Sequence, residues 1–139
     1  MFILFRIYYV LFVYKKIVSI SRKKIVYKIF NCLVYIFFSE GREVSEPFIK
    51  LPTKKELPEY YRRIKNPIDL SGIWFKIEDG TYNKIKDLED DFQLLCRNVQ
   101  TFNEDESLIF QDSITLQSVF KNAIKENVKT EIEGNYYIS

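Results

Sequence analysis

The stretch LPEYYRRIKNPIDL, residues 57–70, belongs to a long connection between two regions of helical periodicity. Proline lacks a backbone N–H donor and restricts the residue before it, so no long helix fits between residues 41 and 67. The connection also holds more apolar surface than a solvated linker would, and a loop of this length inside a compact domain is typical of a binding loop. The prolines are Pro47, Pro52, Pro58 and Pro67, and the large apolar residues are Phe48, Ile49, Leu51, Leu57, Tyr60, Tyr61 and Ile64.

Four segments around this connection show helical spacing. The first covers residues 24–38, the second opens at Asp69 and closes at Gly80, and the third covers residues 85–102. Ser107 is a suitable N-cap for the last helix, which we expect to fray after Thr130. The sequence predicts an all-α bundle of four helices. The apolar stripe of the third helix is Leu88, Phe92, Leu95, Val99 and Phe102, and that of the last is Ile109, Leu116, Val119, Phe120, Ala123 and Ile124.

The composition narrows the chemistry that the chain can perform. A chain that is 47% hydrophobic and 29% charged is globular, and four Gly and four Pro are too few for the turns of a sandwich or barrel. The absence of histidine excludes Ser–His and Cys–His catalysis and the commonest metal ligand. Cys32 and Cys96 lie in apolar contexts and are predicted to be buried free thiols, in a reducing compartment. We expect no cofactor and no metal.

The charge is divided unevenly along the chain. Residues 1–39 hold seven of the 21 Lys and Arg residues and none of the 19 Asp and Glu residues, so the remainder is acidic although the whole chain has a net charge of +2. An acidic domain argues against nucleic acid as the main partner and suits a basic peptide.

Residues 1–23 form an apolar, basic segment of uncertain status. The run FILFRIYYVLFVY, residues 2–14, is shorter than the ~20 residues of a membrane span, and it lacks the basic start and clear cleavage site of a signal peptide. Three interpretations stay open: a stretch that is not a natural part of the domain, a membrane anchor, or an extra helix. The predicted domain covers residues 24–130, followed by a flexible tail at 131–139.

Two runs resemble the signature segments of bromodomains. LPEYYRRIKNPIDL is similar to the family's signature in the loop between the first two helices, and RNVQTFN, residues 97–103, is similar to the segment that ends in the ligand-binding asparagine. The sequence Glu46-Pro47-Phe48 resembles the family's Trp-Pro-Phe shelf, with Glu in place of Trp. The runs GREVSEPFIKLPTKKELPEYY and LLCRNVQTFNEDESLIFQDSITLQSVFKNA resemble the bromodomain of Brahma-type SWI/SNF remodeller catalytic subunits, over residues 41–127.

The resemblance implies a left-handed four-helix bundle, with a long loop between helices 1 and 2, that binds acetyl-lysine on histone tails and catalyses nothing. It implies that Asn103 donates an amide N–H to the acetyl carbonyl and that Tyr60 holds a bridging water. An acetylated histone tail would be the partner, with SWI/SNF-type subunits as further partners and the nucleus as the location. The pocket walls would be Phe48, Leu51, Leu57, Val99, Phe102 and Ile109.

Plainer roles compete with these assignments. Asn103 is also a typical C-cap, Tyr61 is expected to be structural, and Ile109 suits the core as well as a pocket entrance. The chain departs from the family pattern at Phe102, where many members have Tyr, and at Val99, where a small residue is usual in the subgroup. Trp74 replaces a polar residue and predicts an exposed apolar spot. The acidic residues that flank both loops are solvated or attract the lysines of a histone tail: Glu56, Glu59, Glu104, Asp105 and Glu106.

Three other functions are weighed against peptide binding. An enzyme is disfavoured because there is no phosphate-binding loop and no convergent carboxylate pair. A membrane-tethered or purely structural helical bundle would depend on residues 1–38. Nucleic acid would be an auxiliary ligand at most, through Arg62, Arg63 and Lys65.

Overall fold

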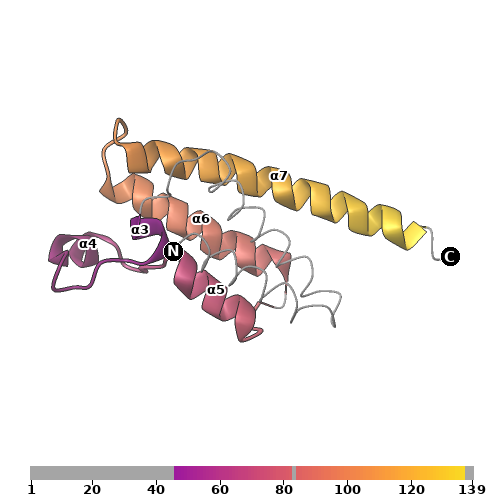
Figure 1. Ribbon diagram of the computed structural model, residues 1–139, viewed down its shortest axis with the longest axis horizontal. Coiled ribbons are helices and arrows are strands. Elements are labelled where there is room, and N and C mark those ends of the chain that lie inside the picture. Colours follow the sequence, from indigo (N-terminus) through magenta and orange to yellow (C-terminus); the bar gives the residue numbers. More distant parts are fainter. Residues whose placement is uncertain (1–45, 83, 137–139) are drawn as a thin grey trace, which may run out of the picture.

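The computed structural model describes residues 46–82 and 84–136, with side chains in the last helix described as far as Glu126. This part of the chain is helical and contains no strand: α3 (Glu46–Ile49), α4 (Pro58–Arg63), α5 (Leu70–Glu78), α6 (Ile85–Phe102) and α7 (Leu108–Tyr136). Figure 1 shows α6 between α5 and α7, with α3 and α4 at one end. The predicted first helix and the segment at residues 1–23 lie outside the described residues.

Local capping marks both ends of α5. The Asp69 carboxylate accepts a hydrogen bond from Gly72 N at 2.7 Å, so Asp69 is the N-cap of α5 as predicted. Gly80 ends that segment with a φ of 74°, a left-handed conformation that glycine adopts without a steric penalty. The bounds of α6 agree with the predicted range 85–102.

The last helix is longer than expected. Ser107 Oγ accepts a hydrogen bond from Phe110 N at 3.3 Å, in agreement with the predicted cap. The helical backbone then continues to Tyr136, beyond Thr130, where we expected it to fray. Propensity alone did not indicate this extension, since residues 131–136 include Gly134 and Asn135, which are poor helix formers.

The core lies between α5, α6 and α7. The rings of Phe92 and Phe120 stack with centroids 4.1 Å apart, which joins α6 to α7. The predicted stripe of α6 is buried as far as Val99, whereas Phe102 is only partly buried. The buried core residues are Phe48, Ile73, Ile77, Leu88, Phe92, Leu95, Cys96, Val99, Leu116, Phe120 and Ala123.

Trp74 does not form the exposed apolar spot that we predicted, because it is partly buried against the core. The neighbouring residue Phe75 is exposed instead, at 70%. The two successive residues lie 100° apart around a helix, and the indole rather than the phenyl ring faces the bundle.

The prediction for Cys96 is confirmed: it is a buried free thiol, and burial raises its pKa to about 12. Cys32 lies outside the described residues.

Polar side chains add a second set of contacts between α6 and α7. Gln100 Nε2 donates to Ser113 Oγ and to Gln117 Oε1, both at 3.0 Å. Gln117 Nε2 in turn donates to Gln93 Oε1 at 2.9 Å. Because these bonds require particular residues to face one another, they fix the register of the two helices in a way that apolar packing alone does not.

No helix in the described ranges is long and apolar enough to cross a membrane. Within the same ranges, no group of three or more His, Cys, Asp and Glu side chains is placed to hold a metal ion.

Candidate functional site

Hydrogen bonds from side chains to backbone shape the connection between α3 and α5. Tyr61 Oη donates to Pro52 O at 2.6 Å, so this tyrosine has the structural role expected of it. Asn98, which is buried on α6, donates from Nδ2 to Asn66 O at 2.8 Å. Each bond satisfies a carbonyl that has no helical partner, and together they hold the irregular segments on either side of α4.

Asp69 and Ser71 anchor the other end of this connection. Asp69 uses one carboxylate oxygen as the cap of α5 and the other to accept from Leu51 N at 2.9 Å. Ser71 Oγ donates to Ile49 O at 2.6 Å. The start of α5 therefore also fixes the chain that leaves α3.

Asn103 ends α6 and keeps a donor available. Its backbone N donates to Val99 O at 3.0 Å, and its side-chain Nδ2 donates to the same carbonyl at 2.9 Å. The C-cap interpretation is therefore correct for the backbone. An amide NH₂ carries two donors, so among the described residues one N–H and the carbonyl oxygen of the side chain stay available. The bond to Val99 O also fixes the orientation of the amide.

Three aromatic rings connect α4 to the last turn of α6. The Tyr60 ring meets the Phe102 ring edge-on with centroids 5.0 Å apart, and it meets the Tyr61 ring edge-on at 5.5 Å. Such edge-to-face contacts are the favoured arrangement for aromatic pairs. Since Phe102 precedes Asn103 directly, the rings bring Tyr60 beside the end of α6.

Tyr60 is buried, with 5% of its surface exposed. Among the described residues, none forms a hydrogen bond with its hydroxyl group. Burial, together with the charges of Tyr61 and Asp69, raises the Tyr60 pKa to about 12. The hydroxyl is therefore neutral at physiological pH, and a buried donor without a protein partner favours binding of water or ligand.

Arg63 connects α4 to α6 from the outside. One of its guanidinium nitrogens donates to Thr101 O at 3.0 Å, and the guanidinium carbon lies 5.3 Å from the centroid of the Phe102 ring. The sequence suggested Arg63 only as an auxiliary contact for nucleic acid. No periodicity indicates this contact, because the bonded residues lie 38 positions apart.

The predicted site residues take three kinds of place. The contacts described above join Tyr60 to Phe102 and Asn103 to Val99. Val99 also belongs to the buried core cluster, together with Phe48. Leu51, Leu57 and Ile109 are partly buried. Of these, Ile109 lies in the first turn of α7 and packs against the core, while Leu51 and Leu57 lie on the connection.

The flanking acidic residues divide into two groups. Glu56 accepts from Thr53 N at 2.7 Å and from Thr53 Oγ1 at 2.9 Å, and these bonds lower its pKa. Glu59 forms an ion pair with Arg62. The three acidic residues after Asn103 are exposed, and among the described residues their carboxylates have no ion pair: Glu104, Asp105 and Glu106.

The bromodomain family model matches residues 36–115. The chain belongs to the bromodomain family. The bromodomain is a binding module rather than a catalytic one. The matched range contains both motifs and the contacts between α4 and α6.

Similar proteins are found among chromatin remodellers. The chain is 46% identical over 101 residues to "ATP-dependent helicase brm" of Drosophila melanogaster, a match that covers 73% of this chain and 6% of that protein. It is 33% identical over 118 residues to "Chromatin structure-remodeling complex subunit RSC4" of Saccharomyces cerevisiae, covering 85% of this chain and 19% of that protein. The chain therefore matches only a small part of these relatives.

The fold comparison agrees with the family. The structure of a bromodomain from human BAZ1A has a TM-score of 0.62 and 26% sequence identity, covering 72% of this chain and 91% of the other. The predicted bromodomain fold is thus confirmed, as is the resemblance to the Brahma-type relatives. The domain boundaries at residues 24 and 130 stay predictions.

Proposed function

We propose that this bromodomain binds acetylated lysine on histone tails, in the nucleus and within a chromatin-remodelling assembly of the SWI/SNF type. The family supports a binding module, and the relatives in remodelling complexes support the setting. The observation that carries the proposal is the arrangement at the end of α6. The Asn103 side-chain amide is oriented by its bond to Val99 O and directly follows Phe102, whose ring packs against the buried Tyr60. Among the described residues, the Tyr60 hydroxyl has no hydrogen-bond partner.

The chemistry suits an acetylated side chain. Acetylation replaces the ammonium of lysine with a neutral amide on an apolar stem. The available N–H of Asn103 donates to the acetyl carbonyl, and a water held by the Tyr60 hydroxyl completes the same acceptor. The bond to Val99 O orients the Asn103 amide before the ligand arrives, which lowers the entropic cost of binding.

The proposed walls explain the preference for the acetylated form. Leu51, Leu57 and Ile109 surround the stem, with Phe102 and the core residues Phe48 and Val99 at its base. An unmodified ammonium would lose its hydration against these groups and meet N–H donors that it cannot use. Such unpaired burial costs several kcal/mol, so unmodified lysine is rejected.

Substitution of Asn103 tests the proposal directly. Asn103→Ala should weaken binding of an acetyl-lysine histone peptide by roughly 5–150-fold, since it removes a buried polar contact worth about 1–3 kcal/mol. Isothermal titration of the 139-residue chain with acetylated and unmodified peptides measures the effect. Asn122→Ala, at an exposed position of α7, is the matched control and should bind normally. Equal binding by wild type and Asn103→Ala would refute the assignment.

A further inference from the structure

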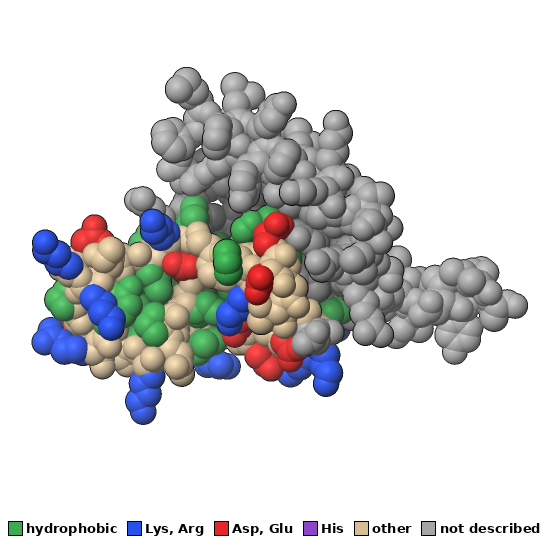
Figure 2. All heavy atoms as spheres, turned by 90° about the horizontal axis from the view of Figure 1, so that it is seen from below, with side chains coloured by type: hydrophobic (Ala, Val, Ile, Leu, Met, Phe, Trp, Pro, Cys, Tyr) green, Lys and Arg blue, Asp and Glu red, His purple; other side chains and the backbone are tan. Residues whose placement is uncertain are grey.

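The two sides of the proposed site carry opposite charge. The connection and α4 hold two exposed acidic residues, Glu56 and Glu59, among a larger number of exposed cations. Figure 2 shows Lys and Arg side chains gathered at this end of the molecule. The exposed cations are Lys50, Lys54, Lys55, Arg62, Arg63 and Lys65.

Local contacts occupy both carboxylates on the basic side. Thr53 donates two hydrogen bonds to Glu56, and the charge of Lys50 contributes to lowering the Glu56 pKa. Glu59 pairs with Arg62. The remaining cations therefore face solvent with no carboxylate paired to them among the described residues, and an anionic ligand can approach them.

Two of these cations touch the aromatic rings of the site. Lys54 Nζ lies 5.8 Å from the centroid of the Tyr61 ring, and the Arg63 guanidinium lies over Phe102. Both rings contact Tyr60. Only one aromatic ring therefore separates each of these two cations from Tyr60, the tyrosine that we assign to acetyl-lysine binding.

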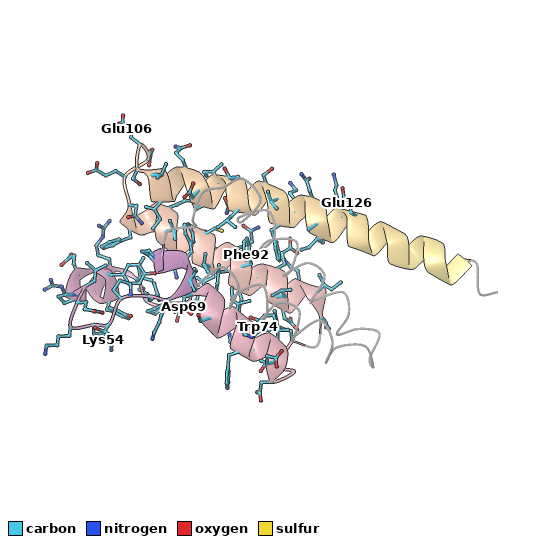
Figure 3. The ribbon with its side chains drawn as sticks, in the orientation of Figure 1. Lys54, Asp69, Trp74, Phe92, Glu106 and Glu126 are labelled. Atoms are coloured by element: carbon cyan, nitrogen blue, oxygen red, sulfur yellow. The ribbon has the colours of Figure 1, made fainter. Side chains whose placement is uncertain are left out.

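The opposite side begins one residue after Asn103. The connection between α6 and α7 is held by its backbone carbonyls: Ser107 donates to Glu104 O, and Gln111 Nε2 donates to Asp105 O at 2.7 Å. The carboxylates of Glu104, Asp105 and Glu106 are left exposed. Figure 3 shows Glu106 and Lys54 on opposite edges of the same end of the molecule.

We propose that the site selects acetyl-lysine peptides by charge polarity, with basic residues on one flank and a phosphorylated residue on the other. The inference rests on the proposed acetyl-lysine function. Basic residues of the peptide lie along Glu104–Glu106, and the phosphate lies against Lys54, Lys55 and Lys65. A phosphate carries a charge of about −1.5 to −2 at pH 7 and attracts a cluster of cations more strongly than a carboxylate does.

Charged residues that flank the acetyl-lysine in an extended peptide lie close enough to it for their charges to be only partly screened. A peptide rises about 3.3 Å per residue, so flanking residues two or three positions from the acetyl-lysine lie about 7–10 Å away. This is comparable with the screening length at physiological ionic strength, about 8 Å. A nucleic acid is a less suitable anion for the same surface, because its continuous negative charge would also meet the three carboxylates after Asn103.

Titrations of the 139-residue chain with matched peptides test the inference. Each peptide carries a central acetyl-lysine, two arginines on one flank and either phosphoserine or serine on the other, and each is made in both orders. We expect phosphorylation to raise affinity by about threefold to tenfold in one order and not in the other. Higher ionic strength should reduce this difference.

Charge reversal identifies the surface responsible. The double substitution Lys55→Glu with Lys65→Glu should abolish the gain from phosphorylation and leave the affinity for the serine peptide within about twofold, since both side chains are exposed. Lys121→Glu with Lys125→Glu, at exposed positions of α7, is the control and should preserve the gain.

The outcomes separate this inference from the proposed function. Equal affinity for phosphorylated and unphosphorylated peptides in both orders overturns the proposed selection by charge polarity. In that case, a preference for acetylated over unmodified peptide that is lost in Asn103→Ala still supports acetyl-lysine binding. Equal affinity for acetylated and unmodified peptides overturns the proposed function. If duplex DNA binds at least as tightly as the best phosphopeptide, and loses affinity with Lys55→Glu and Lys65→Glu, the basic side is a nucleic-acid surface and the inference is wrong.

Discussion

The packed faces of α5, α6 and α7 and the connection between α3 and α5 are held together differently. On the helices, buried apolar side chains recur three or four positions apart, and Phe92 stacks on Phe120 across the interface. In the connection, single side chains bond to single carbonyls, as Asn98 does to Asn66 and Arg63 does to Thr101. The helical region distributes its stability over many contacts, whereas the connection depends on a few.

This difference has a consequence for function. Apolar packing tolerates hydrophobic exchanges of similar volume, because it has no direction. A hydrogen bond is directional, so loss of one partner leaves the other unsatisfied and allows the backbone to move. We therefore expect core substitutions to act on stability first and substitutions in the connection to act on binding first.

The largest effect is expected in the helical region. Phe92→Ala removes a fully buried ring and its stacking contact with Phe120. The substitution should lower the free energy of unfolding by about 3–5 kcal/mol. Urea denaturation followed by circular dichroism measures this. Phe75→Ala, which removes the same side chain from an exposed position on α5, is the matched control and should change stability by less than about 0.5 kcal/mol. Similar losses in both variants would contradict the core that we describe.

Val99 lies where the two regions meet, and its substitution should have effects of opposite sign. It is buried in the core cluster, and its carbonyl accepts both hydrogen bonds from Asn103. Val99→Ala should lower the free energy of unfolding by about 1–3 kcal/mol. If the side chain also narrows the acetyl-lysine channel, the same change should tighten peptide binding.

A urea melt and a peptide titration of Val99→Ala separate the two effects. Lower stability with unchanged affinity would show that Val99 is only a core residue. Lower stability with weaker binding would show that the valine side chain favours acetyl-lysine binding and does not obstruct the channel.

The same contrast explains what the sequence could predict. The bounds of α6 and the cap of α5 follow from periodicity and from Asp69, because these are local patterns. Tyr60 and Asn103 were predicted through the resemblance to the family, and the contact of Tyr60 with Phe102, the residue before Asn103, became visible only in the structure. The contacts of Arg63 and Asn98 and the second role of Asp69 were missed, since each joins residues far apart in sequence through one polar pair. The exposure of Phe75 rather than Trp74 depends on a rotation of α5 that its few apolar positions did not fix.

A smaller effect is expected from one bond in the connection. Tyr61→Phe keeps the ring contact with Tyr60 but removes the 2.6 Å bond to Pro52 O, which should cost about 1 kcal/mol of stability. Because Tyr61 packs on Tyr60, affinity for an acetyl-lysine peptide should fall by about threefold to tenfold. Tyr82→Phe removes a hydroxyl bonded to Asp91 at the opposite end of α6, and serves as the control. Equal losses of affinity in both variants would show that the bond to Pro52 has no special effect on the site.

The smallest effect is expected at Arg63, where the side chain is exposed but its geometry is specific. The planar guanidinium donates to Thr101 O and lies over Phe102, whereas a lysine ammonium cannot do both from one position. Arg63→Lys keeps the charge, so stability should fall by less than about 1 kcal/mol. Affinity should fall by about twofold to fivefold, because α4 is then held less firmly against the turn that ends in Asn103. Arg62→Lys makes the same exchange at the adjacent residue, whose guanidinium pairs only with Glu59 among the described residues, and should bind as wild type does. If the two variants lost affinity equally, the contact between Arg63 and α6 would not position the site. The loss would then come from replacing an exposed arginine on α4 and not from this contact.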